Sequence, residues 1–235
     1  SLEGAVTPLL EAAGELGEDL VLVRTASNNI STARNACLRT ARADLVAFID
    51  DDEWAEPDWL THHLQSLYSA GADAAFGPVK AHYGAGLPAW IVKLDPFSRR
   101  IGPAGQRVSR GSTANALVRK PSLTSRDLAF DERLGRTGGE DSDLFGRLRL
   151  GGGVLIANDA LVHEWVPVHR AQVRYLWRRA LRHGQTYAEN HLVGHGRLKS
   201  AGFFLSTLAK LSASALGTLC TAPLGKAHYM RYALS

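Results

Sequence analysis

Four consecutive carboxylates, Asp50, Asp51, Asp52 and Glu53, are the residues of this sequence best suited to chemistry. Adjacent negative charges raise one another's pKa values, so such a run favours a positive partner. A hard divalent cation such as Mg²⁺ or Mn²⁺ takes oxygen ligands and commonly joins carboxylates to a phosphate. Alternatively, the acids only complement the dipole of a helix that begins near Pro57. Their spacing alone does not choose between a metal site and a plain strand-to-helix loop.

A second acidic pair, Glu140 and Asp141, follows two glycines at the start of an apolar pattern with helical spacing. Asp141 or Ser142 could be an N-cap, which contributes about 1 kcal/mol to helix stability. The alternative is that one acid acts as a general base, held in place by the helix start. Both interpretations fit these residues.

Three further segments could contribute to a site. The small residues 111–115 would let a ligand approach the backbone, or form a plain turn. Residues 79–110 are rich in glycine and proline and read mostly as loop, either solvated or closing over phosphates. His163 and Glu164 end a strand-like run, and alternation puts them on opposite faces, so we expect at most one in the site. The arginines of the loop are Arg99, Arg100, Arg107 and Arg110.

Alternating apolar segments must position these side chains. We expect helices at residues 5–16, 30–41, 57–70 and 144–150, and strands at 20–23, 45–49, 74–76, 154–157 and 160–162. The run 45–49 reads as a buried strand whose carboxyl end carries the acids, which is where open α/β sheets bind ligands. Strand and helix alternate, so the pattern predicts an α/β sheet that is parallel in this half.

Composition and charge narrow the class of protein. The 235 residues contain only two cysteines, far apart, which favours a reducing compartment over a disulfide framework. Residues 1–165 carry 17 Lys and Arg against 22 Asp and Glu, a net charge of −5, whereas 166–235 carry 10 against 1, a net charge of +9. An acidic body with a basic tail suggests that the tail meets anions.

The tail reads as two helices, at residues 171–190 and 198–219. The second is apolar but interrupted by Lys199 and Lys210, so we do not predict a membrane span. An interfacial helix with basic flanks fits the pattern. The alternative is a helix packed on its own domain or on a second subunit.

By its motifs the chain resembles family 2 glycosyltransferases of the GT-A fold, and among them the glucosyltransferases of bacterial exopolysaccharide assembly of the succinoglycan type. The likeness covers about residues 20–185, and three segments in this order carry it: 29–38 (NISTARNACL), 47–54 (AFIDDDEW) and 138–145 (GGEDSDLF). It implies a Rossmann-like mixed sheet with helices on both faces, followed by a basic helical tail. Nothing before residue 5 could form the family's first two strands, so we expect an N-terminally incomplete domain at 1–167 and a helical region, associated with a membrane, at 168–235.

The resemblance also implies roles for individual residues. Asp141, paired with Glu140, is the expected catalytic base. The last acid of the run, Asp52, is expected to hold the metal on the donor diphosphate, and Asp50 to contact the nucleoside side. Glu164 falls where the family often has a metal ligand, with His163 as its competitor. The expected donor-binding residues are Arg34, Asn35, Asp50, Asp51, Ser112, Thr113 and Asn115, and the expected metal ligands are Asp52, Asp50, Glu164 and His163.

The function that the resemblance implies is metal-dependent, inverting transfer of a hexose such as glucose from a nucleotide-diphosphate sugar, with UDP as the expected nucleotide. The acceptor would be a saccharide linked to a polyprenyl diphosphate, at the cytoplasmic face of the bacterial membrane, and no nucleic acid is involved. Two rival classes remain open: a sugar nucleotidyltransferase, for which no glycine-rich phosphate signature is visible, and a non-catalytic protein that binds glycans or nucleotide sugars.

Overall fold

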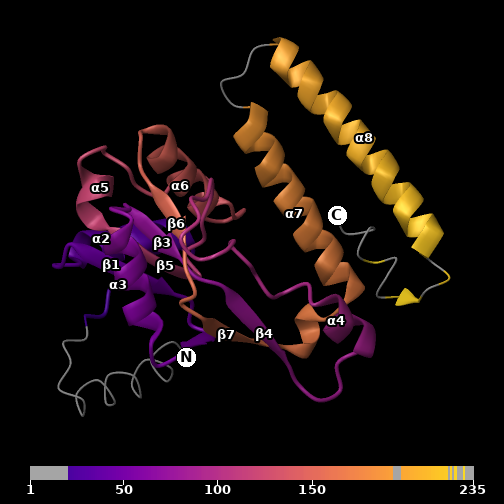
Figure 1. The fold of residues 1–235 in the computed structure, drawn as a ribbon, viewed down its shortest axis with the longest axis horizontal. Helices are drawn as coiled ribbons and strands as arrows, with labels where there is room; N and C mark the ends of the chain where they lie inside the picture. The colour runs from indigo at the N-terminus through magenta and orange to yellow at the C-terminus, as the bar shows by residue number, and fades with distance from the viewer. Residues whose placement is uncertain (1–20, 193–196, 222, 224, 227–229, 231–235) are drawn as a thin grey trace.

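The computed structural model describes residues 21–192, 197–221, 223, 225, 226 and 230. These residues form a mixed α/β architecture with a four-stranded sheet of order β1-β5-β3-β6 and a three-stranded sheet of order β2-β7-β4 (Figure 1). The strands are β1 (Leu45–Ile49), β2 (Glu53–Ala55), β3 (Ala74–Phe76), β4 (Val79–Tyr83), β5 (Asn115–Arg119), β6 (Leu155–Ala157) and β7 (Val162–Val166). The helices are α2 (Ile30–Thr40), α3 (Trp59–Ser69), α4 (Ala89–Leu94), α5 (Lys120–Thr124), α6 (Glu140–Leu150), the 3-10 turn η1 (Val168–Arg170), α7 (Val173–Leu192) and α8 (Arg197–Thr221).

Three strands of the larger sheet each lead, after a few residues, into a strand of the smaller sheet. These pairs are β1 with β2, β3 with β4, and β6 with β7. The first three acids, residues 50–52, form the first crossing at the carboxyl end of β1, and the fourth, Glu53, begins β2. The sequence pattern predicted this position correctly, since a strand end is fixed by the local run of apolar residues.

The larger sheet is mixed, as the resemblance implies, but the expected parallel pairing in the first half is wrong. Strand β5 lies between β1 and β3 and is antiparallel to both, and only β3 and β6 pair in parallel. The strand that separates β1 from β3 comes from some 40 residues further along the chain. Local alternation of strands and helices could not reveal this insertion.

Helices cover both faces of the larger sheet, as expected. Alternation along β5 sends Ala116 and Val118 into one core cluster with Phe145 of α6, and Leu117 into another with Leu67 of α3. Strand β1 is less buried than its apolar sequence predicts, because it lies at the sheet edge among the described residues, and Ile49 is 43% exposed. Burial at β3 and β5, and not at β1, therefore anchors the sheet.

Two other predictions about elements need correction. Residues 21–25 form no regular element, so the strand expected at 20–23 is absent from the described part, and the helix expected at 5–16 lies outside it. The segment 79–110 is less irregular than predicted, since it contains β4 and α4. Strand β4 was missed although its apolar and polar side chains alternate, because the glycines and prolines that follow it favoured a loop.

The two tail helices form as predicted and contact each other, with α7 beginning beside α4 (Figure 1). Leu176 of α7 is buried in one cluster with Ile91 of α4 and Phe97. Within the described residues, no helix combines the length and the apolarity needed to cross a bilayer. The burial of Leu176 shows that the start of α7 packs on the domain. Further along α7, Trp177 and Leu181 are 48% and 59% exposed.

Candidate active site

Arg34 joins the two acidic segments that the sequence singled out. Helix α2 carries Arg34 beside the end of β1, where it donates to Asp50 at 3.3 Å and to Glu140, at the start of α6, at 2.5 Å. The guanidinium carbon also lies 5.7 Å from the centre of the Phe130 ring. The two acidic segments, at residues 50 and 140, thus meet through one half-buried cation.

Gly139 directly precedes helix α6, and its φ of 96° is the left-handed conformation that glycine adopts without strain. The N-cap is therefore Gly139, and neither Asp141 nor Ser142 takes that position. Glu140, Asp141 and Asp143 occupy the first turn, where the helix dipole favours negative charge.

The two acids of the pair differ in environment. Glu140 is buried, its Oε1 is bound by Arg34, and its Oε2 has no hydrogen-bond partner. Burial raises the pKa of Glu140, and the charge of the neighbouring Asp141 raises it further. Asp141 is only half-buried, and its Oδ1 accepts a bond of 2.7 Å from the Ser142 amide.

A second arginine, Arg99, connects the smaller sheet to the acids. It donates to Glu53 of β2 at 2.5 Å and to Glu164 of β7 at 3.3 Å. Burial raises the pKa of Glu53 to about 7 and also raises the pKa of Glu164, in both cases against the opposing charge of Arg99. The Nε atom of Arg99 is buried without a hydrogen-bond partner.

A third arginine, Arg170, binds two of the carboxylates, Asp52 and Glu164. It lies in η1, directly after β7, and its Nη1 is 3.0 Å from Asp52 and 2.8 Å from Glu164. The charged residues therefore form a continuous series in the order Glu140, Arg34, Asp50, Glu53, Arg99, Glu164, Arg170 and Asp52. Acids and arginines alternate except between Asp50 and Glu53, where the Asp50 amide donates to the Glu53 carboxylate at 3.1 Å. We refer to these eight residues as the ionic chain.

The four expected metal ligands do not converge. Asp52 and Glu164 share Arg170, and Asp50 pairs with Arg34. His163 lies on the opposite face of β7, where it bonds to His82 at 2.7 Å and to Glu56 at 2.6 Å. Among the described residues, no group of three or more His, Cys, Asp or Glu side chains could hold a metal ion. This arrangement does not fit a divalent cation, because arginines bind one oxygen each of Asp50 and Asp52 and both oxygens of Glu164.

Of the seven expected donor-binding residues, two are committed to the fold instead. Asn35 of α2 is buried and exchanges two bonds of 2.9 Å with the backbone of Phe130. Asn115 is 2% exposed and uses its whole amide on Trp59, His63 and the carbonyls of Pro78 and Ala160. Both side chains thus bond within the fold, and a donor contact at either stays a prediction.

The other expected donor residues are placed as follows. Arg34 and Asp50 belong to the ionic chain, and Asp51 is exposed next to it. Ser112 is half-buried, while Thr113 is 1% exposed with its hydroxyl unpaired. The small residue at the start of this segment serves packing, since a Cβ on Gly111 would come within 2.1 Å of the Phe76 ring.

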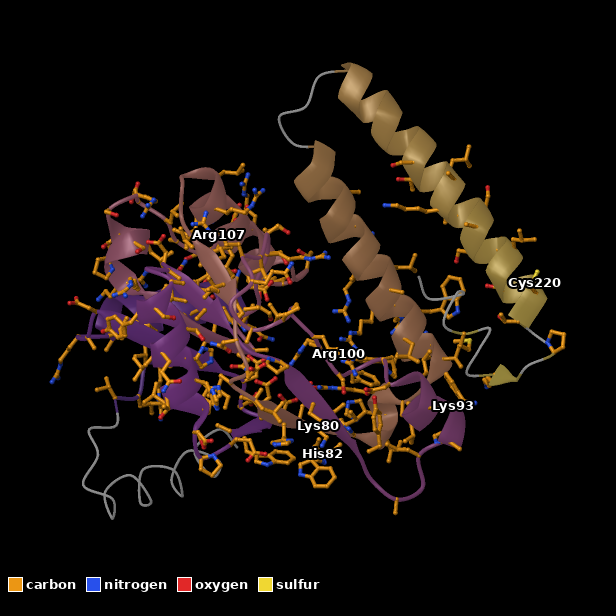
Figure 2. The ribbon with its side chains drawn as sticks, in the orientation of Figure 1. Lys80, His82, Lys93, Arg100, Arg107 and Cys220 are labelled. Carbon is orange, nitrogen blue, oxygen red and sulfur yellow. The ribbon has the colours of Figure 1, made fainter. Side chains whose placement is uncertain are left out.

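Sequence reasoning missed the importance of Arg99 and Arg170. Arg99 was only one of four arginines in a segment expected to be loop, and its companions Arg100 and Arg107, labelled in Figure 2, are exposed by their surface areas. Arg170 was counted only in the charge of the tail. Its position directly after the Glu164 strand was the available signal, but a single basic residue in a basic segment does not stand out.

Comparison with known proteins gives two matches in sequence. The family model described as glycosyl transferase family 2 matches residues 3–126, more than half of the 235-residue chain. The succinoglycan biosynthesis protein ExoM of Rhizobium meliloti (strain 1021) is 40% identical over 185 residues, which cover 78% of this chain and 57% of that protein. The chain thus spans little more than half the length of this curated relative.

Among solved structures, those of S. aureus TarS 1–349 in complex with UDP and with UDP-GlcNAc each align with a TM-score of 0.46. Their sequence identities are 16% and 18%, and the alignments cover 79% of this chain and 57% and 54% of those chains, respectively. The family model and the ExoM relative together show that the chain belongs to glycosyltransferase family 2.

Proposed function

We propose that this protein transfers a sugar from a nucleotide-diphosphate sugar to a saccharide acceptor, with inversion at the anomeric carbon. Membership of family 2 supports sugar transfer as the reaction class. The observation that carries the site is the pair of bonds from Arg34 to Asp50 and Glu140, which brings the end of β1 to the start of α6. The two acidic motifs can therefore act on one substrate.

In this reaction Asp141 is the general base. It accepts the proton of the acceptor hydroxyl while that oxygen bonds to the anomeric carbon, and the bond from this carbon to the diphosphate oxygen breaks. Asp141 suits the task better than Glu140, because Glu140 is buried against Arg34 whereas Asp141 is half-buried with one carboxylate oxygen held by the Ser142 amide. General base catalysis of this kind typically accelerates a reaction about 10²–10⁴-fold.

Negative charge develops on the departing nucleoside diphosphate, so positive groups fixed nearby lower the barrier. Arg34, Arg99 and Arg170 are the cations of the ionic chain that could do so. A divalent cation is implied by the resemblance alone, since the expected ligands do not converge.

For the substrates, we propose a UDP-hexose such as UDP-glucose as the donor and a polyprenyl-diphosphate-linked saccharide as the acceptor. The name of the ExoM relative, which places that protein in succinoglycan biosynthesis, supports an exopolysaccharide or another cell-surface glycan as the product. The rival function, binding of glycans or nucleotide sugars without catalysis, predicts the same donor affinity but no turnover.

We further propose that region 168–235 docks on the cytoplasmic face of the cell membrane. Exposed apolar side chains on α7 and α8 support this, since a basic and partly apolar surface suits anionic lipids. They are Trp177, Leu181, Leu208, Leu211 and Leu216. Co-sedimentation with vesicles containing anionic lipid, compared with neutral vesicles, tests the proposal, and equal recovery from both would argue against it.

The test of the catalytic proposal is a panel of nucleotide sugars, each incubated with the protein and a membrane lipid extract in EDTA, Mg²⁺ or Mn²⁺. Release of one nucleoside diphosphate, with transfer of its sugar to lipid, establishes the activity and names the donor. Binding of a donor without release under any condition would favour the non-catalytic function.

A further inference from the structure

Arg170 occupies the place between two carboxylates where a metal ion was expected. One nitrogen, Nη1, lies 3.0 Å from Asp52 Oδ2 and 2.8 Å from Glu164 Oε1. Glu164 is 5% exposed, so its carboxylate is held away from bulk water and needs a cation close by. A divalent cation that bridged these two oxygens would have to displace the guanidinium nitrogen that now lies between them.

Arg99 holds the other side of the same carboxylate. It reaches Glu164 Oε2 at 3.3 Å and Glu53 Oε1 at 2.5 Å, so two arginines bracket Glu164. Its Nε is buried and has no hydrogen-bond partner. An unpaired buried donor costs free energy unless a ligand completes it.

Both arginines keep donors for an anion. The side chains of Arg99 and Arg170 are 31% and 30% exposed, so neither is sealed into the core. Arginine presents a planar set of N–H donors that matches phosphate oxygens, and its charge does not titrate near neutral pH. The carboxylates of Glu53, Glu164 and Asp52 each hold one terminal nitrogen of these arginines, Nη2 of Arg99 and Nη1 of Arg170, and leave the other terminal nitrogen for a ligand.

We infer that Arg170, together with Arg99, binds the leaving nucleoside diphosphate and supplies the positive charge that a divalent cation was expected to supply. The inference rests on the proposed function and deepens it, because it names the groups that stabilise the leaving group. It predicts donor binding and transfer that persist after metal is removed.

The first experiment measures UDP binding by calorimetry in EDTA, for the full chain and for Arg170→Ala. The wild-type affinity should change less than about twofold between EDTA and Mn²⁺, whereas loss of a charge-assisted bidentate contact should weaken binding in EDTA about 10- to 100-fold. Arg133→Ala is the matched control, because Arg133 pairs with Asp131 on the surface and its side chain is 89% exposed. If another nucleotide is identified by the donor panel, its diphosphate replaces UDP.

The second experiment uses Mn²⁺ alone, followed through the EPR signal of the free ion. Removing Arg170 releases Asp52 and Glu164, so Arg170→Ala should bind Mn²⁺ at least about tenfold more tightly than the wild type. Arg170→Lys keeps the charge but loses the planar donors, so its UDP affinity in EDTA should lie between those of wild type and Arg170→Ala. Thermal melting confirms that each variant is folded.

Two results would overturn the inference. In the first, EDTA abolishes UDP binding by the wild type, Mn²⁺ restores it, and Arg170→Ala binds UDP equally well with Mn²⁺. A divalent cation would then hold the diphosphate in place of Arg170, and the proposed sugar transfer would stand without a role for Arg170. If no donor is bound or turned over with EDTA, Mg²⁺ or Mn²⁺, the proposed function fails as well.

Discussion

Two polar clusters of this protein differ in how completely their buried atoms are paired. The ionic chain runs from Glu140 to Asp52 and leaves Arg99 Nε and Glu140 Oε2 without hydrogen-bond partners. The second cluster, which we call the neutral cluster, consists of Asn115, His63, Asn158 and Trp59. Native proteins pair nearly all buried polar groups, so the unpaired ones are the better indication of a ligand.

The neutral cluster fastens the two sheets together. Asn115 Nδ2 donates to the carbonyl of Pro78, between β3 and β4, at 2.8 Å, and to that of Ala160, between β6 and β7, at 2.6 Å. Its Oδ1 accepts from Trp59 at 2.9 Å and lies 2.8 Å from His63 Nε2. At Gly77 of this joint, a Cβ would come within 1.9 Å of the Ala160 carbonyl oxygen. The comparison teaches that Asn115, an expected donor-binding residue, is bound within the fold, whereas the ionic chain includes Arg99 and Arg170, which were not among the expected site residues.

The largest effect on activity is expected at Asp141. Asp141→Asn should lower turnover about 10²–10⁴-fold, because the acceptor proton loses its base. The affinity for UDP should stay within about threefold of the wild type, since donor binding does not need that base. Steady-state kinetics and calorimetry together check this split.

Asp143→Asn is the matched control for Asp141→Asn. Asp143 lies in the same helical turn but pairs with Arg147 at 2.7 Å, away from the ionic chain. An equal loss of turnover in both variants, or a loss of UDP affinity in Asp141→Asn without loss of turnover, would refute the assigned base.

The largest effect on stability is expected at Asn115. Asn115→Ala leaves the Trp59 and His63 donors and two backbone carbonyls unpaired in the core, each costing about 1–3 kcal/mol. The variant should lose at least about 3 kcal/mol in the free energy of unfolding, measured by urea denaturation. Exposed Asn28→Ala should change it by less than about 0.5 kcal/mol. If Asn115→Ala were fully stable but bound UDP more weakly, Asn115 would have to be a donor-binding residue.

The neutral cluster should also make stability depend on pH through His63. Burial lowers the pKa of His63 to about 4, with a hydrogen bond to Asn115 opposing the shift. The unfolded chain therefore binds more protons than the folded one between about pH 4 and 6.5, so stability is complete above about pH 6.5 and falls as the pH drops. The loss approaches about 3 kcal/mol near pH 4, at about 1.4 kcal/mol per unit of pKa.

Urea midpoints of the wild type and His63→Gln across this range measure the effect. The difference between their unfolding free energies should shrink as the pH falls, because the glutamine does not titrate. A constant difference would show that His63 is not held neutral in the folded protein.

The smallest of these effects separates the two faces of β7. Glu164→Gln removes a charge from the ionic chain and should lower turnover about tenfold, whereas His163→Gln, on the opposite face, should leave turnover within about twofold. Trp54, which stacks on His163 with ring centres 5.2 Å apart, belongs to that same second face, together with Lys80 and His82 of β4 (Figure 2). If His163→Gln impaired turnover as much as Glu164→Gln, the separation of the faces would fail.

The sequence by itself determined which strand carries the acids, which helices precede and follow them, and which family the chain belongs to. Residues 30–40, 45–49 and 59–69 form their elements within about two residues of the expected boundaries, because local periodicity and helix chemistry set them. The alternation that sends His163 and Glu164 to opposite faces is equally local.

Only the tertiary structure decided what those elements bring together. The antiparallel insertion of β5, the enclosure of Asn35 and Asn115, and the meeting of Arg34 with Glu140 across 106 positions all depend on long-range contacts. Arg99 and Arg170 become partners of Glu164 because the paired strands β4 and β7 hold their segments together. The sequence determines that these residues are charged, whereas the packing of the strands determines which carboxylates each arginine binds.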